Sequence, residues 1–181
     1  MKMKTTIAVL AALTVSALAI PITGSVSFTG TVKLDTGNPS TANAVTAWSN
    51  TKVQDADGAF GSFLSTGDTA IFTAPWTFDP STLTSPLWTA GGFTFDLASS
   101  AIEAQFSAGP LKFLNVSGTG TVTGHGYDPT PGNWSFTTQS PSSSGRFSFS
   151  AAAQTSVPDN GGTVALLGMA VLAIGLFKRT L

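Results

Sequence analysis

The central part of this chain alternates apolar with small polar residues at a period of two, and this pattern constrains its fold more than any other feature. Residues 25–34 place an apolar side chain at nearly every second position. Such alternation predicts a strand with one buried face. The whole chain has only nine acidic and eight basic residues. Long surface helices usually need those charged helix formers, so their scarcity also favours strands.

The same alternation recurs along the chain, with turn residues between the segments. We expect strands over residues 25–34, 44–53, 58–64, 68–78 with a bend at Pro75, 87–97, 100–107, 112–124, 133–138 and 146–151. This spacing predicts an all-β domain, and we expect an antiparallel β-sandwich of jelly-roll type. A barrel is the alternative.

Aromatic residues are expected to supply the core of this domain. Each Phe or Trp buries about 150 to 250 Å², so a cluster of them can stabilise a small β-domain without disulfides. In segment 100–107 we expect Ile102, Ala104 and Phe106 to face inward. The chain has no cysteine, which excludes disulfides, thiolate nucleophiles and thiolate metal sites.

The first nineteen residues have the layout of a secretory signal peptide. Lys2 and Lys4 form a positive segment, and an apolar stretch follows over residues 7–18. Ala17 and Ala19 provide the small-residue cleavage pattern, so Ile20 is the expected first residue of the mature protein. Residues 1–19 are therefore expected to direct export, and residues 20–152 to form the β-domain.

The other terminus, residues 153–181, combines a polar motif at 157–163, an apolar run at 164–177 and a basic end at 178–179. A helix of those fourteen apolar residues would be about 21 Å long, short beside the roughly 20 residues of a stable span. We expect a single transmembrane helix that anchors the chain transiently in the inner membrane. Lys178 and Arg179 would act as the stop-transfer signal and stay on the cytoplasmic side.

The polar motif resembles the VPDSG-CTERM signal, a variant of the PEP-CTERM sorting domains. The matching residues are Val157, Pro158, Asp159, Gly161 and Thr163. Asn160 and Gly162 depart from the commoner residues of that pattern, which leaves the position of the cut open. The resemblance implies processing by an exosortase, a membrane-embedded cysteine transpeptidase of Gram-negative bacteria. It also implies a membrane-anchored precursor that later reaches the cell surface or the extracellular space.

The charge of the middle region excludes one class of partner. Residues 20–152 contain four basic and eight acidic residues, a net charge of minus four. Phosphate backbones are bound by clustered Lys and Arg. We therefore expect no nucleic-acid partner.

One fragment has the spacing of a calcium loop. Asp55 and Asp57 are followed by Gly58, and calcium loops use spaced carboxylates before a glycine turn. Asp68 and Asp128 are the only plausible distant ligands. A turn between two strands explains the fragment equally well, so we expect no resident metal or cofactor, with calcium as the alternative.

Catalytic patterns are missing from the sequence. His125 is the only histidine, between two glycines at an expected loop edge, and Glu103 is the only glutamate. No G-x-S-x-G nucleophile motif is present. Two carboxylates brought together by the fold would leave no sequence trace, so a secreted hydrolase is the third alternative. We expect that the protein is not an enzyme.

Two function classes remain for the β-domain. The first is a structural or adhesive component of the cell surface or extracellular matrix, consistent with low charge and a surface rich in Ser and Thr. The second is a binding module for calcium or for an exopolysaccharide. Sugar stacking would need an exposed tryptophan, whereas the alternating pattern predicts that most of Trp48, Trp76, Trp88 and Trp134 lie in the core.

Overall fold

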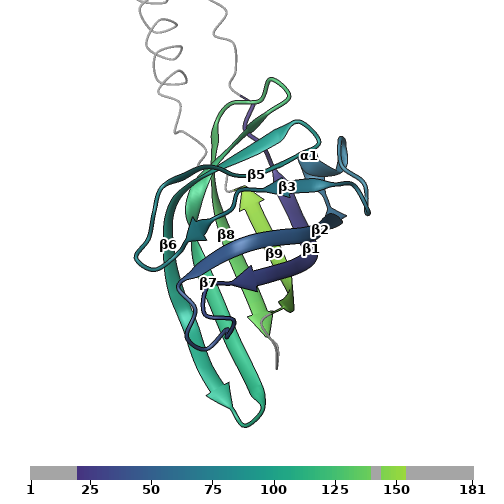
Figure 1. The fold of residues 1–181 in the computed structure, drawn as a ribbon. Coiled ribbons are helices and arrows are strands. Elements are labelled where there is room, and N and C mark those ends of the chain that lie inside the picture. Colours follow the sequence, from purple (N-terminus) through teal and green to yellow (C-terminus); the bar gives the residue numbers. More distant parts are fainter. Residues whose placement is uncertain (1–19, 140–143, 154–181) are drawn as a thin grey trace, which may run out of the picture.

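The computed structural model describes residues 20–139 and 144–153, which form nine strands and one short helix (Figure 1). The strands are β1 (Gly24–Leu34), β2 (Ala44–Ala56), β3 (Ala70–Phe72), β4 (Trp76–Thr77), β5 (Thr84–Ala90), β6 (Phe93–Ala108), β7 (Leu111–Gly124), β8 (Thr130–Gln139) and β9 (Ser144–Ala153). Helix α1 covers Gly58–Gly61. The predicted all-β class is confirmed.

All nine strands belong to one antiparallel sheet with the order β3-β5-β6-β7-β8-β9-β1-β2-β4. From β5 to β9 each strand pairs with its successor in the chain, which is an up-and-down meander. The first and last strands then pair with each other, from Gly24 opposite Ala153 to Lys33 opposite Ser144. The last strand of the described residues, β9, therefore pairs the end of the meander with β1.

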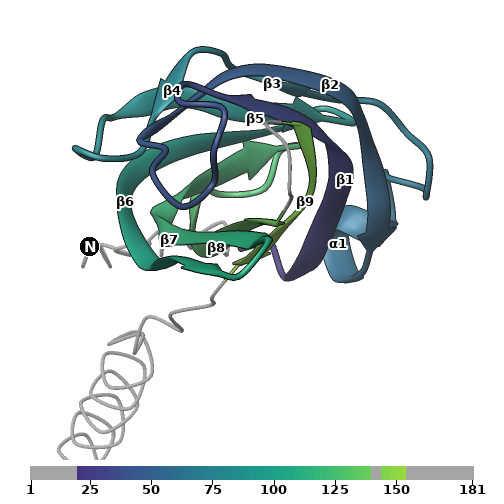
Figure 2. The same cartoon turned by 60° about the horizontal axis from the view of Figure 1, so that its bottom comes forward.

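The two outer strands of that order, β3 and β4, both lie along β2. Thr69, just before β3, forms an antiparallel bridge with Lys52, and Trp76 of β4 pairs with Val45. These pairs share one register, because the two positions are seven residues apart on each side. Residues 69–77 therefore run beside β2 as one interrupted strand. Since β3 also pairs with β5, the sheet closes on itself (Figure 2).

This pairing corrects the expected sandwich of two sheets. One sheet continues around the core and closes, which is the barrel alternative. The physical reason is that alternation specifies only which face of each strand is buried, and both architectures bury one face of each strand. The two differ in which distant strands pair, and a period of two carries no information about that.

Aromatic side chains fill the interior, as predicted. Trp76, Trp88 and Phe136 are each at most 1% exposed. Ring centroids of Trp76 and Phe136 lie 5.8 Å apart, and those of Trp88 and Phe95 lie 5.7 Å apart. A glycine on the neighbouring strand makes room for these rings, since a Cβ at Gly120 would lie 2.4 Å from the ring of Phe95. The inside of this closed sheet is thus a packed core.

The strand expected over residues 58–64 is not formed. Gly58 has a φ of 55°, which turns the chain away from β2 into helix α1. Phe60 is fully buried, whereas Phe63 is 45% exposed. The prediction failed because Gly58 adopts a positive φ, which glycine allows at little cost and which interrupts an extended strand.

The strand expected over residues 87–97 is a hairpin instead. β5 ends at Ala90, and Gly91 and Gly92 both adopt positive φ before β6 begins at Phe93. Two adjacent glycines at positive φ are what a two-residue hairpin turn requires. The Gly-Gly pair in the sequence was the signal for this turn.

The expected strand over residues 100–107 exists as the second half of β6, but its facing is only partly correct. Ile102 packs against the core, as predicted. A register shift between Ile102 and Ala104 then places Ala104 opposite Asn115 and Phe106 opposite Phe113. An extra residue in a strand reverses the alternation beyond it. Phe106, expected inside, is therefore 51% exposed on the outer face.

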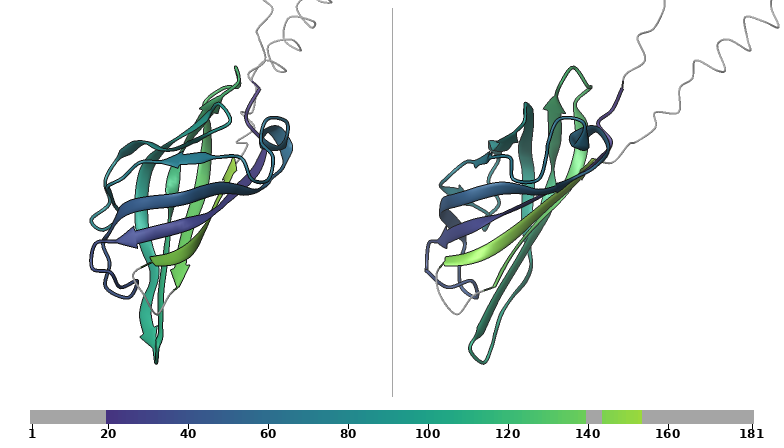
Figure 3. Two further views of the ribbon diagram at one scale, coloured as in Figure 1. Left: turned by 45° about the vertical axis from the view of Figure 1, so that its right-hand side comes forward. Right: turned by 90° about the vertical axis from the view of Figure 1, so that its right-hand side faces the viewer.

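The two ends of the described domain leave it at one end of the barrel, and the β6–β7 hairpin projects at the other (Figure 3). Among residues 20–139 and 144–153 there is no helix long and apolar enough to span a bilayer. The predicted signal peptide at 1–19 and the predicted transmembrane helix at 164–177 lie outside the described residues.

Candidate functional site

The predicted processing segments join the barrel at one rim. Gly24 at the start of β1 pairs with Ala153 at the end of β9. Ile20, the expected first mature residue, lies four positions before Gly24, and the sorting motif begins four positions after Ala153. Any event that cuts the chain at either end therefore acts next to the same rim.

The individual residues of both signals lie outside the described residues. They are Ala17 and Ala19 at the expected signal cleavage site, Val157, Pro158, Asp159, Gly161 and Thr163 of the sorting motif, and Lys178 and Arg179 of the basic end. Their assigned roles stay predictions. The structure contributes the place from which they extend.

Asp57, one of the two calcium candidates, holds the start of β1 against helix α1. Its carboxylate accepts hydrogen bonds from the backbone N–H of Ser25 at 2.5 Å and from the Ser25 hydroxyl at 3.0 Å. The backbone N–H of Asp57 returns a bond to the Ser25 carbonyl at 2.9 Å. Gly24 completes this contact with a φ of 114°, because a Cβ there would lie 2.5 Å from the Asp57 carbonyl oxygen. Asp57 thus has a structural role without a cation.

The other calcium candidates do not join Asp57 in one cluster. Asp55 is exposed on β2, opposite Ser27. Asp68 accepts a bond from the backbone N–H of Ser65 at 2.8 Å, within its own turn. Asp128 pairs its backbone with the segment around Ile20. No group of three or more His, Cys, Asp or Glu suited to a metal occurs in the part of the chain that the structure describes.

His125 occupies the β7–β8 turn and connects three segments there. It adopts a φ of 51° and is exposed. Its imidazole stacks on Phe63, with ring centroids 3.6 Å apart, and meets Phe93 edge-on at 4.7 Å. Its Nε2 lies 2.6 Å from the carbonyl oxygen of Gly91, an acceptor that fixes the proton on Nε2. The imidazole therefore joins the β7–β8 turn to the β5–β6 turn and to the segment after α1. Sequence reasoning missed this contact.

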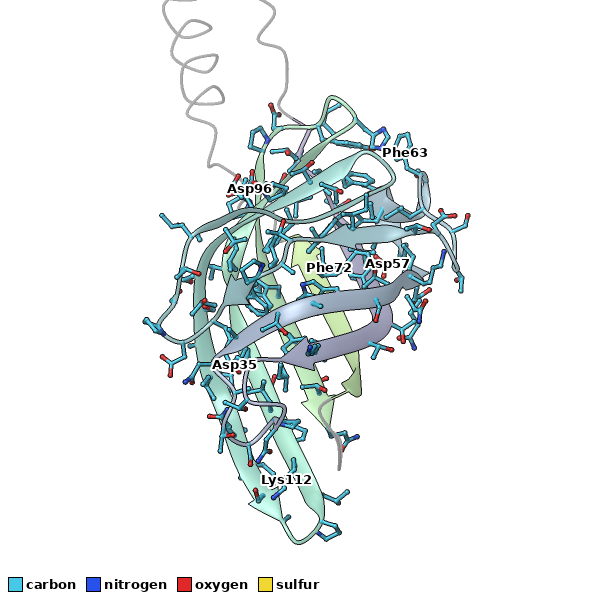
Figure 4. All side chains as sticks on the ribbon, in the orientation of Figure 1. Asp35, Asp57, Phe63, Phe72, Asp96 and Lys112 are labelled. Atoms are coloured by element: carbon cyan, nitrogen blue, oxygen red, sulfur yellow. The ribbon has the colours of Figure 1, made fainter. Side chains whose placement is uncertain are left out.

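The acidic residues of β6 are also hydrogen-bonded to hydroxyls of neighbouring segments. Asp96 accepts a bond from the Ser85 hydroxyl, and Glu103 accepts one from the Ser117 hydroxyl. Figure 4 shows Asp96 in the upper left part of the molecule and Asp57 to the right of its centre, on different elements. These carboxylates are bound within their own parts of the sheet and do not converge on one centre.

The tryptophans are placed as the alternation predicts. Trp76, Trp88 and Trp134 are at most 2% exposed. Trp48 is half-buried and donates a hydrogen bond from its indole Nε1 to the Thr73 carbonyl at 2.9 Å. Three of the four indole rings are therefore inside the core and closed to a sugar, and the Trp48 ring packs against Phe72.

The comparisons with known proteins bear on the C-terminus. A family model described as the VPDSG-CTERM motif matches residues 156–181, about a seventh of the chain. No curated protein and no solved structure matches the chain. The chain is thus a protein with a C-terminal sorting signal. That signal is of the VPDSG-CTERM type, as predicted, and it implies processing by an exosortase and export to the surface.

Proposed function

We propose that this protein is an exosortase-sorted envelope protein whose barrel serves a structural or adhesive role at the cell surface or in the extracellular matrix. The observation that carries the proposal is the VPDSG-CTERM match at residues 156–181. The signal peptide directs export, the barrel folds outside the inner membrane, and the C-terminal helix retains the chain there. Cleavage between Val157 and Gly161 then releases the barrel or transfers it to another acceptor.

The roles of the motif residues follow from their chemistry. Pro158 keeps the preceding residue out of the helical region, so an extended segment is presented to the protease. Asp159 supplies the one negative charge of the motif for recognition. Gly161 lets the backbone fit a narrow site and separates the motif from the apolar run.

The structure supports a passive role for the barrel in three ways. Its interior is filled with aromatic side chains, as in small barrels whose interior is just wide enough for side chains to fill. Its acidic residues Asp57, Asp96 and Glu103 are engaged by serines of the same domain. Its surface carries few charges. A scaffold with these properties suits a repeated surface component better than a catalyst.

The intact mass and location of the protein, in its host with and without a functional exosortase, test this proposal. We expect loss of residues 1–19 and of the chain beyond the motif, with the second loss dependent on the exosortase. Asp159→Asn should block that second loss, and Asp128→Asn, a matched change on the barrel, should not. A mass that retains Lys178 and Arg179 in both strains, with the protein in the inner membrane, would overturn the proposal.

A further inference from the structure

The second half of β6, residues 101–108, has a strand edge without a strand neighbour in the described part of the chain. On one side β6 pairs with β7 over its full length, from Phe93 opposite Gly124 to Ala108 opposite Leu111. On the other side β5 pairs with β6 only as far as Leu97. Beyond Ser100, which bonds to the loop before β5, residues 101–108 have no strand neighbour on that side within the described part of the chain.

This edge lacks most of the devices that protect edges in natural sheets, which are lysines, prolines, inward charges and bulges. Residues 101–108 contain no Lys and no Pro, and their one charge is Glu103. The Glu103 carboxylate is bonded to the Ser117 hydroxyl on β7, so it lies over its own sheet and not beyond the edge. The bulge beside Ile102 is one protective feature of this strand.

The hairpin that carries this edge ends in an apolar tip. Phe106 is 51% and Leu111 is 57% exposed, two of the six large hydrophobic side chains exposed on the described residues. Phe106 and Phe113 pack across the strands with ring centroids 5.2 Å apart. Lys112 is the only charged residue at the tip and is half-buried (Figure 4).

The side chains of Gln105 and Ser107 hold the hairpin against the β1–β2 loop. The Gln105 side chain donates hydrogen bonds to the carbonyls of Pro39 and Ala42 at 3.0 and 2.7 Å. The Ser107 hydroxyl bonds to the Ser40 hydroxyl at 2.9 Å. These contacts fix the strand in extended form against the β1–β2 loop and use side chains, so the backbone groups of the edge stay available. A preordered edge reduces the entropy that pairing costs.

We propose that this edge docks a second copy of the same chain by antiparallel pairing of β6 with β6. An antiparallel strand pair about a two-fold axis presents identical donors and acceptors to each other, so the edge is complementary to itself. Its alanines Ala101, Ala104 and Ala108 offer no steric obstacle. A two-fold contact closes after two copies and does not extend into a fibre. A bilayer is a poorer occupant, because free backbone groups at the edge would be unsatisfied in hydrocarbon.

The size of the contact indicates a weak dimer in dilute solution. Eight paired residues span about 27 Å at roughly 3.4 Å per residue. Stable interfaces bury about 1,200 to 2,000 Å², and a single pair of eight-residue strands is a small contact beside that range. Where two surfaces that each carry many copies face one another, the high effective concentration compensates for weak pairing.

Antiparallel pairing also fixes how the two copies are oriented. The rim where Gly24 meets Ala153 lies at the far end of the barrel from the β6–β7 hairpin (Figure 3). The two-fold axis therefore places the two rims, and the sorting signals that extend from them, at opposite ends of the dimer. Such a dimer connects two surfaces. This inference rests on the proposed function and deepens it by naming the partner as another copy.

The absence of cysteine makes the test direct. In the full chain, produced in its host, Ala104→Cys introduces one thiol beside the proposed two-fold axis, next to the same thiol of the other copy. Ala47→Cys, exposed on β2, is the matched control. After treatment with a short bis-maleimide, we expect the Ala104→Cys variant to double its apparent mass, and the control to stay single. Co-expression of a tagged and an untagged copy should give the mixed pair.

A second substitution tests whether the cross-link depends on the pairing of the two β6 strands. Phe106→Glu in the Ala104→Cys variant places a second carboxylate opposite Glu103 of the other copy and should abolish the doubled species, because like charges directly opposite each other destabilise a strand pair. Tryptophan fluorescence confirms that the barrel is folded. An Ala104→Cys variant that cross-links no more than Ala47→Cys, or that links only to a different protein, would overturn the inference. Exosortase-dependent processing is measured in the same strains. Normal processing without the dimer refutes only the edge pairing, whereas loss of that processing step refutes the proposed function.

Discussion

Replacement of Phe136 by alanine should cost a large part of the stability of this barrel. Phe136 is fully buried, and its ring packs edge-on against both Trp48 and Trp76, with centroid distances of 5.6 and 5.8 Å. Truncation of a buried Phe to Ala costs about 3 to 5 kcal/mol, since it removes transfer free energy and leaves a cavity. A domain of this size is stable by about 5 to 15 kcal/mol. The loss is therefore a third of the total or more in most of that range.

Urea unfolding followed by intrinsic fluorescence measures this loss, because the four tryptophans are at least half-buried and report on the core. The slope of the transition should stay constant while its midpoint falls, which separates a stability change from a change in the unfolded state. The same substitution at Phe106 is the control. Phe106 is 51% exposed and its one aromatic partner is Phe113.

A cross-strand pair of that kind contributes about 0.2 to 1 kcal/mol. Phe106→Ala should therefore shift the midpoint slightly, and Phe136→Ala should shift it several times further. Equal losses for the two variants would refute the assignment of inner and outer faces. A larger loss for Phe106 would mean that the alternation is not reversed at the bulge beside Ile102.

Three further outcomes follow from local contacts. Asp57→Ala should lower the melting temperature because it removes both bonds to Ser25, whereas the exposed neighbour Asp55→Ala should leave it unchanged. Millimolar calcium or chelator should not move the melting temperature of the wild-type protein, since the Asp57 carboxylate is already engaged; an upward shift would reveal a bound cation. Gly120→Ala should abolish soluble folded protein, because its Cβ would lie 2.4 Å from the Asp96 carbonyl oxygen, and survival under limited proteolysis would contradict this.

The alternation predicted the strands well wherever a segment stays in one register. The segments expected at 25–34, 44–53 and 112–124 correspond to β1, β2 and β7. The bend expected at Pro75 is the interruption between β3 and β4, and both halves keep one register with β2. Local sequence specifies these features because they depend only on neighbouring residues.

Features that depend on distant contacts were not predictable in this way. The bulge beside Ile102 reverses the facing of Phe106, and its effect appears only once the register of β6 against β7 is known. Closure of the sheet depends on pairs such as Lys52 with Thr69, and no periodic pattern carries that information. The fragment at Asp57 has the spacing of a calcium loop, but the bonds from Ser25, thirty-two positions earlier, decide its role.

The sorting signal was the part of the candidate site that the sequence alone identified. Its residues are contiguous, so motif, apolar run and basic end are visible without a fold, and the family model matches the same region. The stacking contact between His125 and Phe63 brings together residues sixty-two positions apart, which a linear pattern does not reveal. The sorting signal could be predicted because its residues are neighbours in the sequence, and the His125–Phe63 contact could not because its residues are not.

The position of β9 leads to a final prediction about the length of chain that the barrel needs. β9 pairs with β1 from Gly24 to Lys33 and with β8 from Gly132 to Gln139, so its removal leaves two strand edges unpaired at once. A chain that ends after residue 155 should melt like the sorted product, whereas a chain that ends after residue 143 should show no cooperative transition. The first variant controls for the loss of the sorting signal. Cooperative melting of the shorter chain at the same temperature would mean that β9 is dispensable, and the sheet would then not be closed by its last strand.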